Sequence, residues 1–130
     1  MKMDIDCIRD ILLRVENGNI FIPSTHFYDE EQLKEFSDKE LIFKKYSFEK
    51  VSYHARLCDE FGFLKASSMS AGMAISDLSA QGHLFLADIR SDNVWSKTKE
   101  VSNKIGVASI SALKQIALNV ASALISNQFK

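Results

Sequence analysis

Residues 47–76 read SFEKVSYHARLCDEFGFLKASSMSAGMAIS, and this stretch decides the fold. Ser47 can cap a helix and Gly62 can end one, so a helix is predicted over residues 48–61. The apolar side chains between them recur every three or four residues and therefore share one helical face. These side chains are Phe48, Val51, Ala55 and Cys58. The segment predicts an amphipathic helix that packs one face against a core.

A β-hairpin is predicted directly after this helix. Residues 63–66 and 73–76 are short apolar segments, and the small residues between them, 67–72, suit a turn. A helix followed by a hairpin is the second half of a winged helix-turn-helix. In that fold residues 48–61 would be the recognition helix and residues 67–72 would be the wing.

The residues upstream supply the first half of such a fold. A helix is predicted from Asp4, which can cap it, to Asn17-Gly18, which can end it. Residues 19–23 predict a short strand, and a capping box at Asp29 opens a short helix to about Phe36. Three short helices cannot close a core alone, so the strand and hairpin should form a small antiparallel sheet over the open side.

Three further helices are predicted downstream, beginning after Ser79, after the break at 91–93 and at Ser109 or Ser111. We therefore expect an α+β, mostly helical chain. A winged helix-turn-helix domain of three helices and a small antiparallel sheet should occupy residues 1–90. Residues 91–130 should form a C-terminal helical extension that serves packing or dimerisation.

The last predicted helix carries a heptad-like apolar seam. The seam consists of Ile110, Leu113, Ala117, Val120 and Leu124. A short helix of this kind does not stay folded alone in water, so it must find a partner. The partner is its own domain, a second copy, or a membrane surface or other protein. A homodimer formed through this seam would place two recognition helices side by side.

Composition and charge restrict the class of protein. The 130 residues are 46% hydrophobic and 25% charged, which is typical of one soluble globular domain. Sixteen basic and seventeen acidic residues give a net charge of −1, which argues against a polycation that coats nucleic acid. The start at Met1 lacks the apolar run of a signal peptide, and the C-terminal residues 105–129 are too polar for a membrane span. Two cysteines, Cys7 and Cys58, form no motif and predict reduced thiols in the cytoplasm.

The predicted recognition helix and the residues before it supply candidate nucleic-acid contacts. They are Lys44, Lys45, Lys50, Ser52, Tyr53 and Arg56, and His54 is expected beside them on the exposed side of the helix. Three acids share the helix, Glu49, Asp59 and Glu60, and the wing has no cation, so a monomer would bind double-stranded DNA weakly. The alternative is an ordinary solvated face, with Tyr53 and His54 half-buried and hydrogen-bonded to the first helix.

No catalytic or metal-binding pattern is found, so no enzyme, cofactor, metal or small-molecule substrate is expected. The three histidines, His26, His54 and His83, lack the spacing that zinc sites use. Cys58 is four residues from His54 but belongs to the apolar face, which predicts a buried structural thiol. His83 is expected to pack against Trp95.

Three stretches resemble a bacterial and phage family catalogued as domain of unknown function 2513. They are the opening MKMDID with IRDILL, the central YHARL with EFGFL at 53–64, and LSAQGHLFLADIR with VWSK at 78–97. The pairing of Gly82-His83 with Val94-Trp95 is the most specific of these features. The resemblance implies a small winged-helix-like protein, often encoded by prophages, without assigned functional residues. Residues 26–46 look longer than in the family, and Ala87 replaces a usual acid.

Two main functions follow from these observations. The first is a non-enzymatic DNA-binding regulator, dimeric and of phage or mobile-element type. The second is a protein-interaction module that docks a host or phage protein through its acidic segment at 29–40 and its C-terminal helix. A third function is a membrane-surface accessory that uses the same C-terminal helix.

Overall fold

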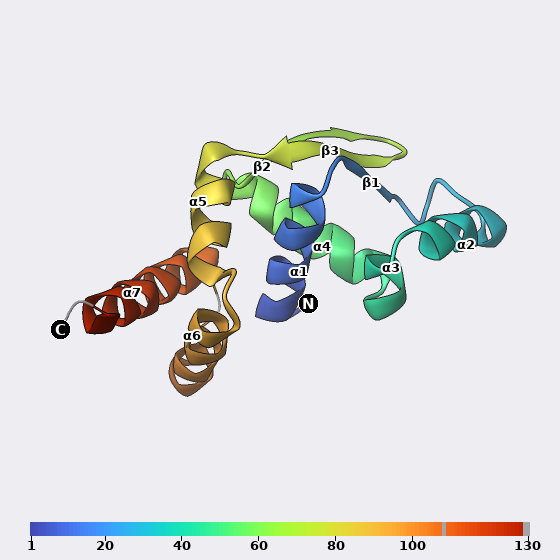
Figure 1. The fold of residues 1–130 in the computed structure, drawn as a ribbon. Helices are drawn as coiled ribbons and strands as arrows, with labels where there is room; N and C mark the ends of the chain where they lie inside the picture. The colour runs from blue at the N-terminus through green and yellow to red at the C-terminus, as the bar shows by residue number, and fades with distance from the viewer. Residues whose placement is uncertain (108, 129–130) are drawn as a thin grey trace.

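The computed structural model describes residues 1–107 and 109–128 of the chain. These residues form seven helices and a three-stranded antiparallel sheet (Figure 1). The predicted α+β, mostly helical class is therefore confirmed. In chain order the elements are α1 (Ile5–Glu16), β1 (Ile20–Pro23), α2 (Glu30–Lys39), α3 (Ile42–Lys45), α4 (Phe48–Glu60), β2 (Leu64–Met69), β3 (Gly72–Leu78), α5 (Ala80–Ile89), α6 (Asp92–Ile105) and α7 (Ile110–Gln128).

The helices begin at the capping residues that the sequence indicates. The Asp4 carboxylate accepts hydrogen bonds from the first turn of α1, and Ser47 accepts one from the backbone N–H of Lys50. Asp29 and Gln32 form the complete capping box of α2. These side chains satisfy backbone N–H groups that have no partner inside the helix, which fixes where each helix starts.

Helix α3 was not predicted, and packing rather than local sequence explains it. Leu41 at its N-cap makes no side-chain capping bond. Ile42 and Phe43 are buried, and the Phe43 ring lies 4.7 Å from the ring of Phe48 on α4. Burial of these two side chains supplies the stability that a four-residue helix lacks by itself.

The sheet has the strand order β1-β3-β2, with Ile20 opposite Ile75 and Leu64 opposite Leu78. Its inner face is apolar and packs on the helices, whereas the outer face carries Phe21, Ser67 and Ala74. The strands run further than expected, because only Ser70 and Ala71 lie outside them at the tip of the hairpin.

One buried cluster joins the helices to the sheet and continues into the C-terminal part of the chain. Besides residues of α1, α4, α5 and the sheet, it contains Trp95, Ile110, Leu113 and Ala117. Trp95 also donates a hydrogen bond of 2.9 Å to Asp6 on α1. Segments on both sides of the expected boundary at residue 90 therefore share a core.

Figure 1 shows how the helices and the sheet are arranged in space. The sheet covers α1 and α4 on one side, with α2 and α3 at one end and α5, α6 and α7 at the other. None of the helices in the described residues is long and apolar enough to cross a membrane.

Candidate nucleic-acid interface

Helix α4 has one buried face and one face that is open to solvent. Val51, His54, Ala55 and Cys58 are buried, while Arg56 is exposed and Ser52 and Tyr53 are half-buried. The helix ends where Gly62 takes a φ of 89°, a left-handed conformation that glycine adopts without steric cost. This turn directs the chain into β2, so the hairpin is placed beside the open face of α4.

A groove of about 420 Å³ lies between α4 and the tip of the hairpin, and we call it the α4–hairpin groove. Helix α4 contributes Glu49, Ser52, Tyr53 and Arg56 to its lining, and the hairpin contributes Ser68, Met69 and Ser70, among others. Ser24, Thr25 and His26 line it from the loop after β1. Hydroxyl groups and one guanidinium therefore converge on a single concave surface.

Lys50, which the sequence suggested as a DNA contact, is instead paired within the chain. Its Nζ lies 2.7 Å from Oδ2 of Asp4, at the start of α1. Burial acts to raise the pKa of Asp4, but hydrogen bonds from Lys50 and from backbone N–H groups outweigh it, so the pKa lies below its ordinary value. Lys50 therefore holds α4 to α1, and its charge is already neutralised.

Lys45 is engaged in the same way. Its Nζ lies 2.7 Å from Oδ2 of Asp10, and the hydroxyl of Tyr46 donates a 2.6 Å hydrogen bond to the same oxygen. Burial and this carboxylate raise the pKa of Tyr46. Among the predicted cations, Lys44 and Arg56 are exposed and have no ion pair with any described residue.

The expectation that His54 is exposed is wrong, and the alternative of a hydrogen-bonded histidine is correct. His54 is completely buried, and its Nε2 accepts a hydrogen bond of 2.7 Å from the backbone N–H of Asp4. Burial lowers the pKa of this imidazole. Tyr53 lies beside it, with the two ring centroids 5.1 Å apart.

The burial of Cys58 confirms the prediction made from the apolar face of α4. Cys7 and Cys58 are both free and buried. Burial raises the pKa of each thiol to about 12, so neither is an activated nucleophile at neutral pH. Across the described residues, no group of three or more His, Cys, Asp or Glu side chains is placed to hold a metal ion.

Two expectations for the C-terminal half need correction. Ile110, Leu113 and Ala117 are buried in the chain's own core, so they cannot form the seam of a homodimer. Of the predicted seam, Val120 is half-buried and Leu124 is 38% exposed. His83 does not pack against Trp95, because its imidazole is half-exposed and lies 3.6 Å from Asp77.

Comparison with known proteins supports the resemblance found in the sequence. The model of a family described as "Hypothetical protein (DUF2513)" matches residues 2–108. An uncharacterized protein of Haemophilus influenzae (strain KW20 / Rd) is 31% identical over 131 residues, which cover 97% of this chain and all of that protein. No solved structure matches the chain. The match to the family model spans most of the chain, and the chain therefore belongs to the DUF2513 family of hypothetical proteins.

Proposed function

We propose that this protein is a winged-helix protein that binds double-stranded DNA through the α4–hairpin groove. The order of elements supports the assignment. Helix α1, strand β1, helices α2 to α4 and the β2–β3 hairpin follow one another as in a winged helix-turn-helix, with α3 as an additional turn. The strand order β1-β3-β2 places the hairpin at one side of α4, where a wing would lie.

The observation that carries the proposal is the shared lining of this groove. Arg56 and Ser52 on α4 face the same space as Ser68 and Ser70 on the hairpin. Arginine binds phosphate or the edge of guanine, and hydroxyl groups donate to phosphate oxygens or bases. One duplex could therefore contact the helix and the hairpin together.

The charges of the groove set the expected strength of binding. Glu49 lies in the groove with Arg56, and the ion pairs of Lys45 and Lys50 remove two of the predicted phosphate contacts. Lys44 and Arg56 keep unpaired charges, but only Arg56 lines the groove, so the affinity of a single copy should fall with salt at a log–log slope of only about −1 to −2.

A second copy would raise this affinity, and we propose that two chains associate through the end of α7. Val120 and Leu124 are the predicted seam residues that the core leaves partly open, and Leu118 and Ile125 next to them are exposed. Sedimentation equilibrium of the wild type and of Leu124→Glu tests this contact. A monomeric wild type at micromolar concentration would disprove it.

DNA binding is tested by fluorescence polarisation with a labelled mixed-sequence duplex at low salt. We expect Arg56→Gln to weaken binding several-fold and to reduce the salt slope by about one. Glu49→Gln should strengthen binding, because it removes a negative charge from the same groove. Lys104→Gln, an equal loss of positive charge on α6 and outside the groove lining, is the matched control and should change little.

Two results would contradict the proposal. One is the absence of binding to any duplex at about 50 mM salt, where contacts to phosphate are strongest. The other is an equal loss of DNA affinity in Arg56→Gln and Lys104→Gln, which would show that binding depends on the net charge of the protein and not on the groove.

A further inference from the structure

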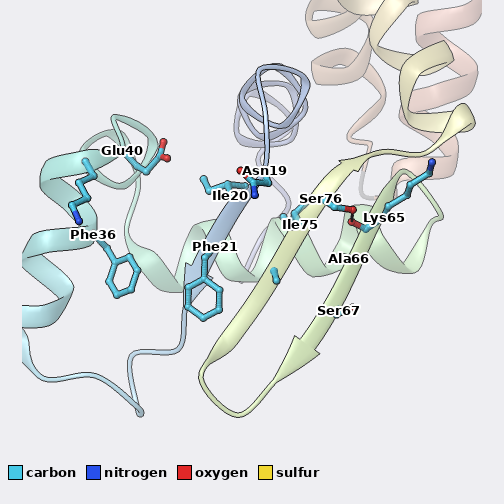
Figure 2. Close-up of a pocket in the computed structure, with 12 residues that line it drawn as sticks. Asn19, Ile20, Phe21, Phe36, Glu40, Lys65, Ala66, Ser67, Ile75 and Ser76 are labelled. Atoms are coloured by element: carbon cyan, nitrogen blue, oxygen red, sulfur yellow. Dashed lines mark hydrogen bonds between the residues drawn. The ribbon is translucent and has the colours of Figure 1, made fainter.

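The outer face of the sheet carries a second groove, which we call the outer-sheet groove (Figure 2). It has a volume of about 730 Å³ and crosses β1, β3 and β2 from the side of helix α2. Figure 2 shows Phe36 and Glu40 on the α2 side, Phe21 next to them and Lys65 at the opposite side. None of the four residues belongs to the α4–hairpin groove.

The floor and wall of the outer-sheet groove are apolar and already ordered. The rings of Phe21 and Phe36 lie 5.9 Å apart, and that of Tyr28 lies 5.1 Å from Phe36, so three aromatic side chains brace one another. On β2 and β3 the lining includes the small residues Ala66, Ser67, Ala74 and Ser76, together with Ile75 and Lys65. Small side chains beside an aromatic wall leave room for an apolar side chain from another molecule.

Two lysines, Lys39 and Lys65, and one carboxylate line the groove, so its lining carries a net charge of +1, although its α2 side belongs to the acidic segment 29–40. Its carboxylate, Glu40, is held by Arg14 through hydrogen bonds of 2.7 and 2.6 Å, and these lower the pKa of Glu40. Lys39 and Lys65 are exposed and form no ion pair with any residue from 1–107 or 109–128. Asp77 lies opposite Lys65 in the sheet but forms no ion pair with it. Its carboxylate accepts a hydrogen bond from the backbone N–H of Leu78.

The direction of the groove decides what kind of segment fits it. It crosses the three strands instead of following an edge, and β3 in the middle already pairs with both neighbours. A ligand that lies across the middle of the groove therefore meets side chains, and unpaired backbone groups are found only along the outer edges of β1 and β2. A helix, whose own backbone groups are already paired, suits such a surface better than an extended peptide.

We propose that the outer-sheet groove docks an acidic amphipathic helix of a partner protein. Its apolar side chains would lie against Phe21, Phe36 and Ala74, and its carboxylates would pair with Lys39 and Lys65. This site is independent of DNA binding, because Ser67 on β2 lines the outer-sheet groove while its neighbour Ser68 lines the α4–hairpin groove.

The test uses two fluorescein-labelled helical peptides and the full chain. Both peptides carry Leu at every third or fourth position, and the flanking positions are Glu in one and Lys in the other. We expect the Glu peptide to bind the wild type at least about tenfold more tightly than the Lys peptide. Lys39→Glu combined with Lys65→Glu should reverse this preference.

Two further variants separate the groove from general charge effects. Ala74→Trp fills the floor without a change in charge and should abolish binding of the Glu peptide, with circular dichroism as the check on folding. Lys34→Glu on α2, whose side chain is 79% exposed and lies outside the groove, should leave binding unchanged. Amide chemical shifts should move at Ser67 and Ala74 on addition of the Glu peptide.

The proposal is overturned if the Glu peptide does not bind at millimolar concentration. It is also overturned if Lys34→Glu weakens binding as much as the double variant, or if Ala74→Trp retains binding. Because DNA binding is measured with Arg56→Gln at the other groove, each proposal can fail without the other.

Discussion

The backbone N–H of Asp4 donates a 2.7 Å hydrogen bond to Nε2 of His54, which lies 50 residues further along the chain. Since Nε2 accepts, Nδ1 carries the proton and donates to the carbonyl oxygen of Lys50, also at 2.7 Å. Both ring nitrogens are therefore satisfied by a neutral imidazole. A second proton on the ring would face an N–H donor and lose the bond that joins α4 to the start of α1.

This geometry makes the free energy of unfolding depend on pH. Burial lowers the pKa of His54 below 6.5, so at mildly acidic pH the unfolded chain binds a proton that the folded chain does not. Stability should fall as the pH drops below 6.5, by at most about 1.4 kcal/mol per pH unit. Urea denaturation of the wild type and of His54→Gln at about pH 7.5 and 5.5 measures the difference.

The control for this prediction is His26→Gln, which removes an exposed histidine. It should retain the pH dependence of the wild type, whereas His54→Gln should lose most of it. If His54→Gln does not fold, NMR titration of the imidazole in the wild type measures the same pKa. An imidazole of His54 that titrates at or above 6.5 would contradict the prediction.

Gly82 on α5 lies too close to the backbone of Phe63, the residue before β2, for any side chain. A Cβ at this position would be 2.1 Å from the carbonyl oxygen of Phe63. Gly82→Ala should therefore destabilise the fold by about 3 kcal/mol, although helix propensity alone predicts a gain of about 1 kcal/mol. Thermal or urea unfolding shows whether Gly82→Ala lowers or raises the free energy of unfolding. The control is Gln81→Ala on the exposed side of α5, whose stability should stay within about 0.5 kcal/mol of the wild type.

Thr98 on α6 buries a hydroxyl group that has no hydrogen-bond partner among the described residues. Thr98→Val removes the hydroxyl and keeps the branched shape, so we expect the free energy of unfolding to rise by about 1 kcal/mol. Thr98→Ser keeps the hydroxyl and loses the methyl group, and it should lower stability by a similar amount. A loss of stability in Thr98→Val would show that the hydroxyl has a partner.

Leu113 and Leu124 distinguish the packed part of α7 from its open end. Leu113 is completely buried, whereas Leu124 is 38% exposed. Leu113→Ala should cost about 3 kcal/mol, and Leu124→Ala should cost less than about 1 kcal/mol in the monomer at low concentration. Equal costs would mean that the C-terminal end of α7 is held as firmly as its start.

The predictable parts of this fold are those with local signals. Asp4, Ser47 and Ser79 each cap the helix that was expected to follow them, because a capping side chain bonds N–H groups only two or three residues away. The hairpin was also predicted, but its strands extend beyond residues 66 and 73. These residues belong to the strands because they pair across the hairpin, and the small side chains of Ser67, Ser68 and Gly72 gave no local signal for a strand.

The surface of the candidate site was less predictable, because its exposed charges depend on contacts with residues that are far away in the sequence. Lys50 pairs with Asp4 and Lys45 with Asp10, and helical spacing cannot reveal partners on another helix. His54 was placed on the open side for the same reason, since only the fold shows that α1 begins against it. The outer-sheet groove was missed because Phe21 and Phe36 come from separate elements.

The alternation of Ser67 and Ser68 between two grooves constrains how the length of the hairpin can change. Insertion of one residue early in β2 would exchange every later side chain of that strand between the two faces and spoil both grooves at once. Two residues added at Ser70 and Ala71 would lengthen the tip and leave both faces intact. Relatives that keep both surfaces should therefore change the length of the hairpin at its tip and not within β2.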